Sequence, residues 1–211
     1  MSEAQDQLFL STAASLAELA SVKILELHSN FSVQAKSDRS PVTEADFASD
    51  RIIREGLKQA FPDHAILTEE SGLEGDANAE WIWVIDPLDG TKAYVKKIPG
   101  FSIMIGLLHR EEPYLGVVKD PILGYRYEAI RDRGAYLVEN HQRKKLKVSS
   151  RHDFSEMPWV VSTGFPQEKL DLLQKKFHFP LLAPINSVGI KVGLLVREQG
   201  DVYLNHHSVH Y

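Results

Sequence analysis

The stretch Trp81–Lys92, which reads WIWVIDPLDGTK, is the most informative part of this chain. An apolar run typical of a buried strand ends at Asp86, and a second aspartate, Asp89, follows three residues later. Desolvating a carboxylate is costly, so two of them at the end of an apolar strand need a partner, and a hard cation such as Mg²⁺ suits a close pair. Gly90 and Thr91 add a turn whose N–H groups and hydroxyl suit a phosphate group. The pattern therefore indicates metal-assisted chemistry on a phosphate, although an ordinary Asp-Pro and Asp-Gly tight turn is the alternative.

The bulk composition allows this chemistry and excludes several others. The 211 residues suffice for one large domain or two small ones, and the hydrophobic share of 43% and charged share of 25% are ordinary for a globular protein. A net charge of −5 argues against a binder of nucleic-acid polymers but not against a small anionic substrate next to bound Mg²⁺. The chain has no cysteine, which excludes disulfides, zinc–thiolate sites and cysteine nucleophiles.

The N-terminus predicts the compartment. The first residues, MSEAQD, lack the basic-then-apolar pattern of a signal peptide. We also expect that no apolar run approaches the length needed to span a membrane. Together with the absence of cysteine, these features lead us to expect a cytoplasmic protein without a membrane partner.

Hydrophobic periodicity predicts an α/β protein. Apolar residues at helical spacing from Leu8 to Leu27 predict a first helix, and a second starts near Thr43 and runs toward Phe61. Six strand-like runs with turn signals between them then suggest an antiparallel meander: 65–68, 81–85, 101–108, 115–118, 125–130 and 135–138. After a polar, basic stretch at 141–158, the order becomes strand (159–162), helix (166–177), short strand, helix (about 186–198) and strand (201–204), which is typical of an α/β unit.

Several segments taken together resemble one family. The stretch 41–46 with Asp50, the run Glu69-Glu70-Ser71, the block 83–91 and the run 200–203 occur in the order seen in the inositol monophosphatase superfamily, a group of lithium-sensitive, Mg²⁺-dependent phosphatases. The resemblance extends from the first helix to the last residue. It implies a layered α/β fold: an N-terminal helix pair on an antiparallel sheet over residues 1–140, then a smaller, incomplete α/β unit over 141–211.

The resemblance also assigns roles, position by position. Glu69, Asp86 and the backbone carbonyl of Leu88 would hold one Mg²⁺, and Asp86 would bridge to a second ion that Asp89 also holds. Two or three Mg²⁺ ions are expected in all, with Li⁺ as an inhibitor. Ions about 3.5–4 Å apart can hold the attacking and leaving oxygens of a phosphoryl transfer.

Other side chains are expected around these ions. Asp46 would hydrogen-bond Thr91, and this dyad would orient and deprotonate a water molecule, while Glu70 would support the cluster. Backbone N–H groups of Gly90 and Thr91 would bind the phosphate. Lys36 would lie near the site as a cation, and Lys191 is either a substrate contact or a solvated helix lysine. Taken alone, the Glu69-Glu70 pair reads as a solvated loop and Asp46 as a helix-capping residue.

Within the superfamily, details favour one substrate. The run 36–43, KSDRSPVT, and the pair Thr91-Lys92 resemble 3'(2'),5'-bisphosphate nucleotidases, whereas Ala93-Tyr94 departs from their usual pattern. The resemblance therefore implies hydrolysis of 3'-phosphoadenosine 5'-phosphate, with inositol-1-phosphate as the alternative substrate and fructose-1,6-bisphosphate as a comparison. Family members are commonly dimers, so a homodimer is expected on the resemblance alone.

The end of the chain departs from the family pattern. In the family, a Trp-Asp-x-x-Ala segment that supplies a further metal ligand follows the strand, but this sequence stops at Tyr211 without it. We therefore expect a truncated C-terminal unit. The alternative of another class is an inactive remnant that binds phosphate or metal.

Overall fold

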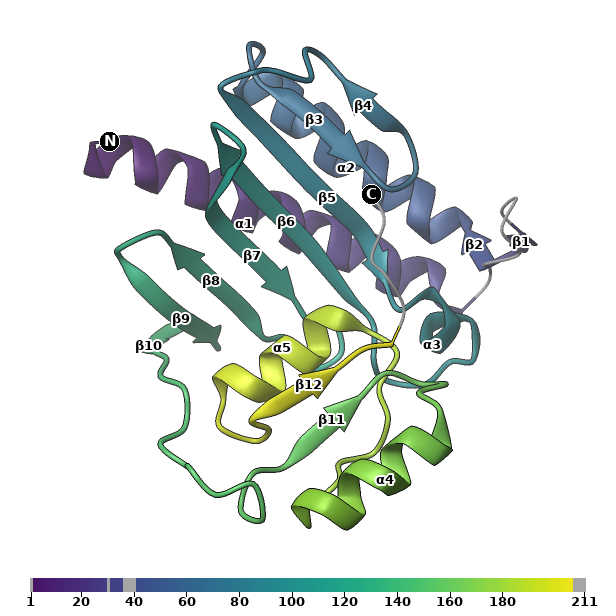
Figure 1. The fold of residues 1–211 in the computed structure, drawn as a ribbon. Coiled ribbons are helices and arrows are strands. Elements are labelled where there is room, and N and C mark those ends of the chain that lie inside the picture. The colour runs from purple at the N-terminus through teal and green to yellow at the C-terminus, as the bar shows by residue number, and fades with distance from the viewer. Residues whose placement is uncertain (1, 30, 36–40, 207–211) are drawn as a thin grey trace.

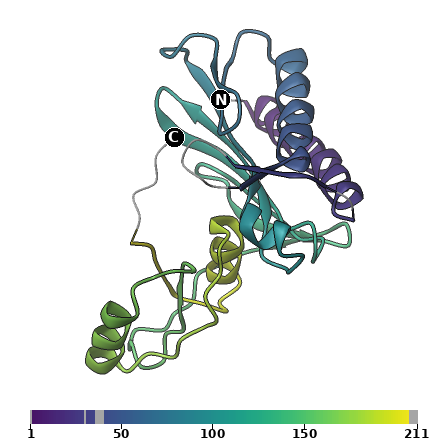
Figure 2. The same ribbon diagram turned by 90° about the vertical axis from the view of Figure 1, so that its right-hand side faces the viewer.

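The protein consists of a layer of helices on a large sheet, followed by a smaller unit (Figures 1 and 2). A computed structural model describes residues 2–29, 31–35 and 41–206. The predicted layered architecture, a helix pair on a sheet followed by a small α/β unit, is confirmed.

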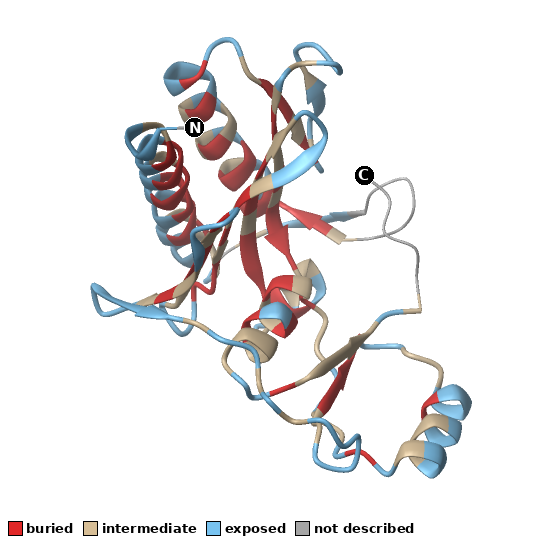
Figure 3. Cartoon of the chain, turned by 60° about the vertical axis from the view of Figure 1, so that its left-hand side comes forward, coloured by how far each residue is buried: buried red, intermediate tan, exposed pale blue. Residues whose placement is uncertain are grey.

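Two long helices cover one face of the sheet. Helix α1 (Glu3–Leu27) begins after Ser2, whose hydroxyl accepts a hydrogen bond from the Gln5 N–H, and α2 (Glu44–Ala60) begins after Thr43. The buried side chains of both helices, among them Phe9 and Ile53, pack on the strands. Figure 3 colours the buried residues red, and on both helices they lie on the face toward the sheet. By length and composition α1 could cross a membrane, so the expectation that no segment approaches that length is wrong. Its buried face packs on the sheet, as in a core helix of a globular protein.

The main sheet has eight strands in the order β10-β9-β8-β7-β6-β5-β3-β4. Their bounds are β3 (Ala65–Thr68), β4 (Gly72–Glu74), β5 (Trp81–Asp89), β6 (Ser102–His109), β7 (Glu112–Lys119), β8 (Arg126–Ile130), β9 (Gly134–Glu139) and β10 (Gln142–Lys145). The basic run that begins at Arg143 thus lies in the last strand of this sheet, which continues past residue 140. All four residues of β10 are exposed.

The expectation of a purely antiparallel sheet is wrong at one position. Strands β5 to β10 form the predicted meander, but β3 pairs with β5 in parallel, with Thr68 opposite Ile85. The reason is that β4 returns along the outer side of β3 as a hairpin, and the chain then crosses back so that β5 occupies the other side of β3. The parallel pair matters because the carboxyl ends of both strands meet at the same edge of the sheet.

Several short helices and strands were not predicted from the sequence. They are β1 (Val33–Ala35) and β2 (Pro41–Thr43), which pair with each other, together with β4, β10 and the short helix α3 (Thr91–Val95). Each spans only three to five residues, too few for a hydrophobic period to appear.

The C-terminal unit is small, and few of its hydrophobic side chains are buried together. Strands β11 (Trp159–Val161) and β12 (Val202–Leu204) pair in parallel, with α4 (Gln167–Phe177) and α5 (Val188–Val196) between them in the chain. Its cluster of buried hydrophobic side chains consists of Trp159, Val161, Leu170 and Phe179. Within this unit, α5 lies next to the main sheet, and α4 lies far from the sheet (Figure 2).

Candidate active site

The parallel pairing of β3 and β5 brings two acidic segments together. The N–H of Glu69, just after β3, donates a 3.2 Å hydrogen bond to the carbonyl of Ile85, the residue before Asp86. The turn after β3 is itself held in place, because the Ser71 hydroxyl donates to the buried carboxylate of Asp50 (2.7 Å). The two acids that the sequence reading placed in one metal site therefore lie on adjacent strand ends.

These residues line one open pocket of about 220 Å³. The pocket contains most of the side chains expected in the site, and Pro41, Lys92 and Asn186 in addition; its full lining is Pro41, Glu69, Asp86, Leu88, Asp89, Gly90, Thr91, Lys92 and Asn186. Asn186 is the contribution of the C-terminal unit. Lys36 lies outside the described residues, and neither Asp46, Glu70 nor Lys191 is among the residues that line the pocket.

The electrostatics of the pocket favour a cation. Burial raises the pKa of Asp86 well above its usual range, and the nearby charges of Asp89 and Glu69 raise it further. One hydrogen bond, from the Leu88 N–H to Asp86 Oδ1 (3.2 Å), acts in the opposite direction. A divalent cation between these carboxylates would relieve both the burial penalty and the mutual repulsion.

The donor set fits Mg²⁺ in chemistry. Three carboxylates and a backbone carbonyl offer only oxygen ligands, which hard cations prefer. In this arrangement, however, no three His, Asp or Glu side chains of the described residues converge closely enough to hold an ion. The Leu88 carbonyl accepts the Thr91 hydroxyl (3.0 Å), and the Asp89 carboxylate is turned toward α5.

Asp46 and Thr91 are in direct contact. The Thr91 hydroxyl lies 3.1 Å from Asp46 Oδ1, which is the hydrogen bond that the resemblance implied. The other carboxylate oxygen of Asp46 accepts the N–H (2.7 Å) and the hydroxyl (2.6 Å) of Thr43, so the same aspartate also closes the capping box of α2. Burial raises the pKa of Asp46, and the hydrogen bonds from Thr43 and Thr91 partly offset this. The capping and the dyad interpretations are therefore both correct descriptions of its contacts.

The turn after Asp89 requires glycine. Gly90 has a φ of 91°, in the left-handed region, and caps the start of α3. A Cβ there would lie 2.6 Å from the Gly100 carbonyl oxygen and 3.1 Å from Cβ of Ser187. Only glycine lets the turn approach both segments. The first N–H groups of a helix have no partner within it, so this turn can present donors to an anion.

Lys191 is neither solvated nor in the pocket. Its side chain is fully buried, and the ammonium donates to Ser162 Oγ (2.8 Å) and to the carbonyls of Ile185 (3.0 Å) and Asn186 (3.3 Å). Burial lowers the pKa of Lys191 to about 8. The interpretation as a solvated helix lysine is wrong, and the amine instead holds the chain segment just before α5.

Asp89 has partners that the sequence reading missed. Its carboxylate accepts hydrogen bonds from the hydroxyls of Ser102 and Ser187 and from the N–H groups of Val188 and Gly189. Ser187 lies 98 residues from Asp89 in the chain, so only the fold brings them together. The one sequence signal was a serine directly before an apolar helix, which is typical of an N-cap.

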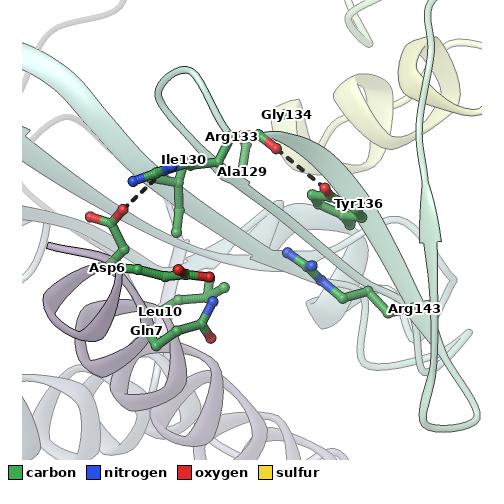
Figure 4. A pocket seen from close by; sticks show the side chains of 10 residues that line it. Asp6, Gln7, Leu10, Ala129, Ile130, Arg133, Gly134, Tyr136 and Arg143 are labelled. Carbon is green, nitrogen blue, oxygen red and sulfur yellow. Dashed lines mark hydrogen bonds and ion pairs between the residues drawn. The ribbon is translucent and has the colours of Figure 1, made fainter.

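A second pocket, of about 180 Å³, lies between the start of α1 and strands β8 and β9 (Figure 4). Asp6, buried on α1, accepts hydrogen bonds there from the Tyr114 hydroxyl and from Arg133 Nε (3.2 Å). At the other end of the pocket, Arg143 stacks on Tyr136 and donates to Glu128 (2.5 Å). These paired charges fasten α1 and β10 to the sheet, and we assign them a structural role.

Comparison with known protein families gives one match over almost the whole chain. The model of the inositol monophosphatase family matches residues 5–211. Among curated relatives, a Nus factor SuhB of Pasteurella multocida is 37% identical and covers 67% of this chain and 51% of its own length. A 3'(2'),5'-bisphosphate nucleotidase CysQ of Haemophilus influenzae is 32% identical, covering 82% and 65%. A histidinol-phosphatase of Streptomyces coelicolor is 37% identical, covering 77% and 62%. The chain thus spans between about half and two thirds of the length of these relatives.

Solved structures support the same fold. An inositol monophosphatase from Anabaena is 25% identical, with a TM-score of 0.80, over 97% of this chain and 77% of its own. An IMPase/NADP phosphatase described as complexed with Mg²⁺ and phosphate has a TM-score of 0.78 over 96% of this chain and 76% of its own, at 21% identity. The second likeness concerns the fold alone.

Proposed function

The chain belongs to the inositol monophosphatase family, a family of metal-dependent phosphomonoesterases, and from this premise we propose that it is a Mg²⁺-dependent phosphatase of 3'-phosphoadenosine 5'-phosphate. The observation that carries the proposal of a phosphatase is the pocket in which Glu69, Asp86 and Asp89 meet the Gly90-Thr91 turn. Three acids beside a turn that begins a helix suit a cation together with a phosphate.

The cation would be held by oxygen atoms only. Glu69, Asp86, Asp89 and the backbone carbonyl of Leu88, which all line the pocket, would bind Mg²⁺. Bound Mg²⁺ supplies positive charge that neutralises the phosphate oxygens as the bond to the leaving oxygen breaks. Without it, three carboxylates would repel a phosphate.

The Asp46–Thr91 pair would orient and deprotonate the attacking water. The Thr91 hydroxyl has one proton, which Asp46 and the Leu88 carbonyl both accept at about 3 Å, so its oxygen lone pairs remain available to a water molecule. When Thr91 accepts a proton from that water, its own proton can pass to Asp46. Because burial raises the pKa of Asp46, this carboxylate is a better proton acceptor than an exposed one.

The phosphate would sit against the Gly90–Thr91 turn. Its backbone N–H groups can donate to the phosphate oxygens without moving, because the left-handed Gly90 already fixes the turn. Asn186, the pocket residue from the C-terminal unit, is placed to contact the remainder of the substrate.

The choice of 3'-phosphoadenosine 5'-phosphate rests on two observations. The run 36–43 and the pair Thr91-Lys92 resemble bisphosphate nucleotidases, and the relative named as such aligns with 82% of the chain. Inositol-1-phosphate is the second candidate, because an inositol monophosphatase is the structural neighbour at 25% identity.

A substrate panel tests this proposal. Phosphate release by the 211-residue chain would be measured with Mg²⁺ on 3'-phosphoadenosine 5'-phosphate, inositol-1-phosphate and histidinol phosphate, with EDTA as control. The proposal predicts EDTA-sensitive release with the highest kcat/KM on the nucleotide. A preference for either other ester would refute the nucleotidase assignment, and no release from any of them would refute catalysis by this chain.

Three further expectations are proposed without a structural argument. A cytoplasmic location follows from the N-terminal sequence and the absence of cysteine, and a homodimer and inhibition by Li⁺ follow from the family resemblance. Sedimentation of the purified chain and phosphate release in the presence of LiCl would test the second and third.

A further inference from the structure

The Asp89 carboxylate is enclosed by four hydrogen-bond donors. Asp89 Oδ2 accepts from the hydroxyls of Ser102 (2.8 Å) and Ser187 and from the Gly189 N–H (2.8 Å), and Oδ1 accepts from the Val188 N–H (3.1 Å). Asp89 ends β5, Ser102 begins β6, and the other three residues form the start of α5. One carboxylate therefore joins the main sheet to the C-terminal unit.

The close approach of these segments depends on a glycine. A Cβ on Gly189 would lie 2.3 Å from Ser102 Oγ and 2.8 Å from Cγ1 of Val118, so any larger residue would push α5 off the sheet. Ser102 and Ser187 are both fully buried, and their hydroxyl oxygens lie 2.9 Å apart. The arrangement is thus tightly packed and not a chance contact at the surface.

The two oxygens of Asp89 differ in their remaining capacity. A carboxylate offers about four lone-pair positions, two on each oxygen. Oδ2 has three donors and no room for a further ligand, whereas Oδ1 has one donor and one position left. Asp89 also lines the pocket, so Oδ1 is the oxygen that remains for a ligand there.

We propose that Ser102 and Ser187 are positioning residues for Asp89: they hold its Oδ2 against α5 and leave Oδ1 as the single oxygen that binds Mg²⁺. This inference rests on the proposed function, because it assumes that the pocket binds Mg²⁺. Residues that orient a metal ligand typically change metal affinity 10- to 100-fold when they are removed.

Ser102 is the more informative of the two serines. Ser187 also accepts the Ile190 N–H (3.0 Å) as the N-cap of α5, so its loss would weaken the helix as well. The hydrogen bonds of Ser102 Oγ in the described structure go to Asp89 and Ser187. An effect of Ser102→Ala therefore reports on Asp89 and its surroundings.

The test compares three serine variants of the full chain. Mg²⁺ binding is measured by titration calorimetry, and the exchange rates of the Val188 and Gly189 amide protons are measured by NMR. We expect Ser102→Ala to raise the Kd for Mg²⁺ about 10-fold and to accelerate both amides. Ser187→Ala should raise the Kd as well, but it also weakens α5, because it removes the acceptor of the Ile190 N–H. Ser21→Ala, at a buried serine of α1, is the matched control and should change neither quantity.

A double-mutant cycle shows whether Ser102 acts through Asp89. In an Asp89→Asn background, Ser102→Ala should have no further effect on Mg²⁺ affinity. Asp89→Asn should itself accelerate the Gly189 amide, because a side-chain NH₂ in place of Oδ2 cannot accept that N–H. We therefore expect the Asp89→Asn chain to keep the main sheet folded and to loosen the contact of that sheet with α5.

The outcomes separate this inference from the proposed function. Wild-type Mg²⁺ affinity in a folded Ser102→Ala chain would overturn the inference, whatever the phosphatase activity. If the wild type binds Mg²⁺ no better than Asp86→Asn, the proposed function fails and the selection of Oδ1 for Mg²⁺ fails with it. Unchanged Val188 and Gly189 exchange in both Ser102→Ala and Asp89→Asn would then overturn the positioning role as well.

Discussion

The main helix–sheet layer, residues 3–145, and the C-terminal unit, residues 159–204, differ in how they are held together. The first has one continuous hydrophobic core that extends from Phe9 to Ile130, whereas the buried cluster of the second consists of four side chains. Yet the small unit supplies Asn186 to the pocket and three of the four donors around Asp89. The difference teaches that the small unit contributes to the site through its contact with the sheet more than through a core of its own.

A cavity in the core of each unit tests this difference most strongly. Ile103→Ala in the main core should lower the free energy of unfolding by about 3 kcal/mol, because it removes a fully buried side chain. Val161→Ala should lower the main thermal transition much less and instead accelerate amide exchange in α5. Calorimetry and amide exchange on the two variants check this. Equal losses in the main transition would show that the two units unfold as one.

The second prediction concerns the chemistry of the larger unit. Thr91→Ala should lower kcat about 100-fold, the scale of one lost general-base interaction, since the hydroxyl that faces Asp46 is removed. Thr91→Ser keeps the hydroxyl and serves as the control. Phosphate release under saturating Mg²⁺ measures both, and equal rates for the alanine and serine variants would contradict the role of the dyad.

The third prediction is that the site lowers the stability of the scaffold that carries it. Burial and the charges of Asp89 and Glu69 raise the pKa of Asp86 above its ordinary 3.8. At pH values between 3.8 and the raised pKa, the folded state therefore binds more protons than the unfolded state. The stability of the metal-free chain should therefore fall as pH rises through that window. Asp86→Asn should make the metal-free chain more stable at neutral pH by about 1 kcal/mol and flatten this dependence.

Urea unfolding in EDTA across the pH range measures this prediction, with Ser21→Ala as a control for the loss of a buried polar group. A less stable Asp86→Asn chain at neutral pH would show that Asp86 is a structural residue.

The fourth prediction concerns Lys191, whose hydrogen bonds join α5 to other segments of the C-terminal unit. Burial lowers the pKa of Lys191 from 10.5 to about 8, so between these values the unfolded state binds more protons. The stability contribution of Lys191 therefore rises with pH from about 8 to 10.5. Lys191→Met should remove this rise, as followed by urea unfolding at several alkaline pH values. The same slope in both chains would mean that the ammonium is hydrated in solution.

Local patterns predicted much of the fold and of the chemistry. The two long helices, the meander of strands and the acid pair in the last part of β5 all follow from residues close in sequence. The parallel pairing of β3 with β5 did not, because a short strand has no sequence signal for which neighbour it joins. The same holds for the burial of Lys191 and for the contact of Asp89 with Ser187. Lys191 reaches Ser162, 29 residues away, and Asp89 reaches Ser187, 98 residues away, and contacts over such separations leave no periodic trace in the sequence.

One measurement tests the central claim most directly, namely that the acids at the ends of β3 and β5 form a Mg²⁺-dependent phosphatase site. Phosphate release by the wild-type chain would be followed after EDTA treatment and again after addition of Mg²⁺, side by side with Asp86→Asn. We expect EDTA to abolish the activity of the wild type and Mg²⁺ to restore it, and we expect at least a 100-fold lower rate in Asp86→Asn. Turnover by Asp86→Asn at the wild-type rate, or turnover unaffected by EDTA, would contradict this claim.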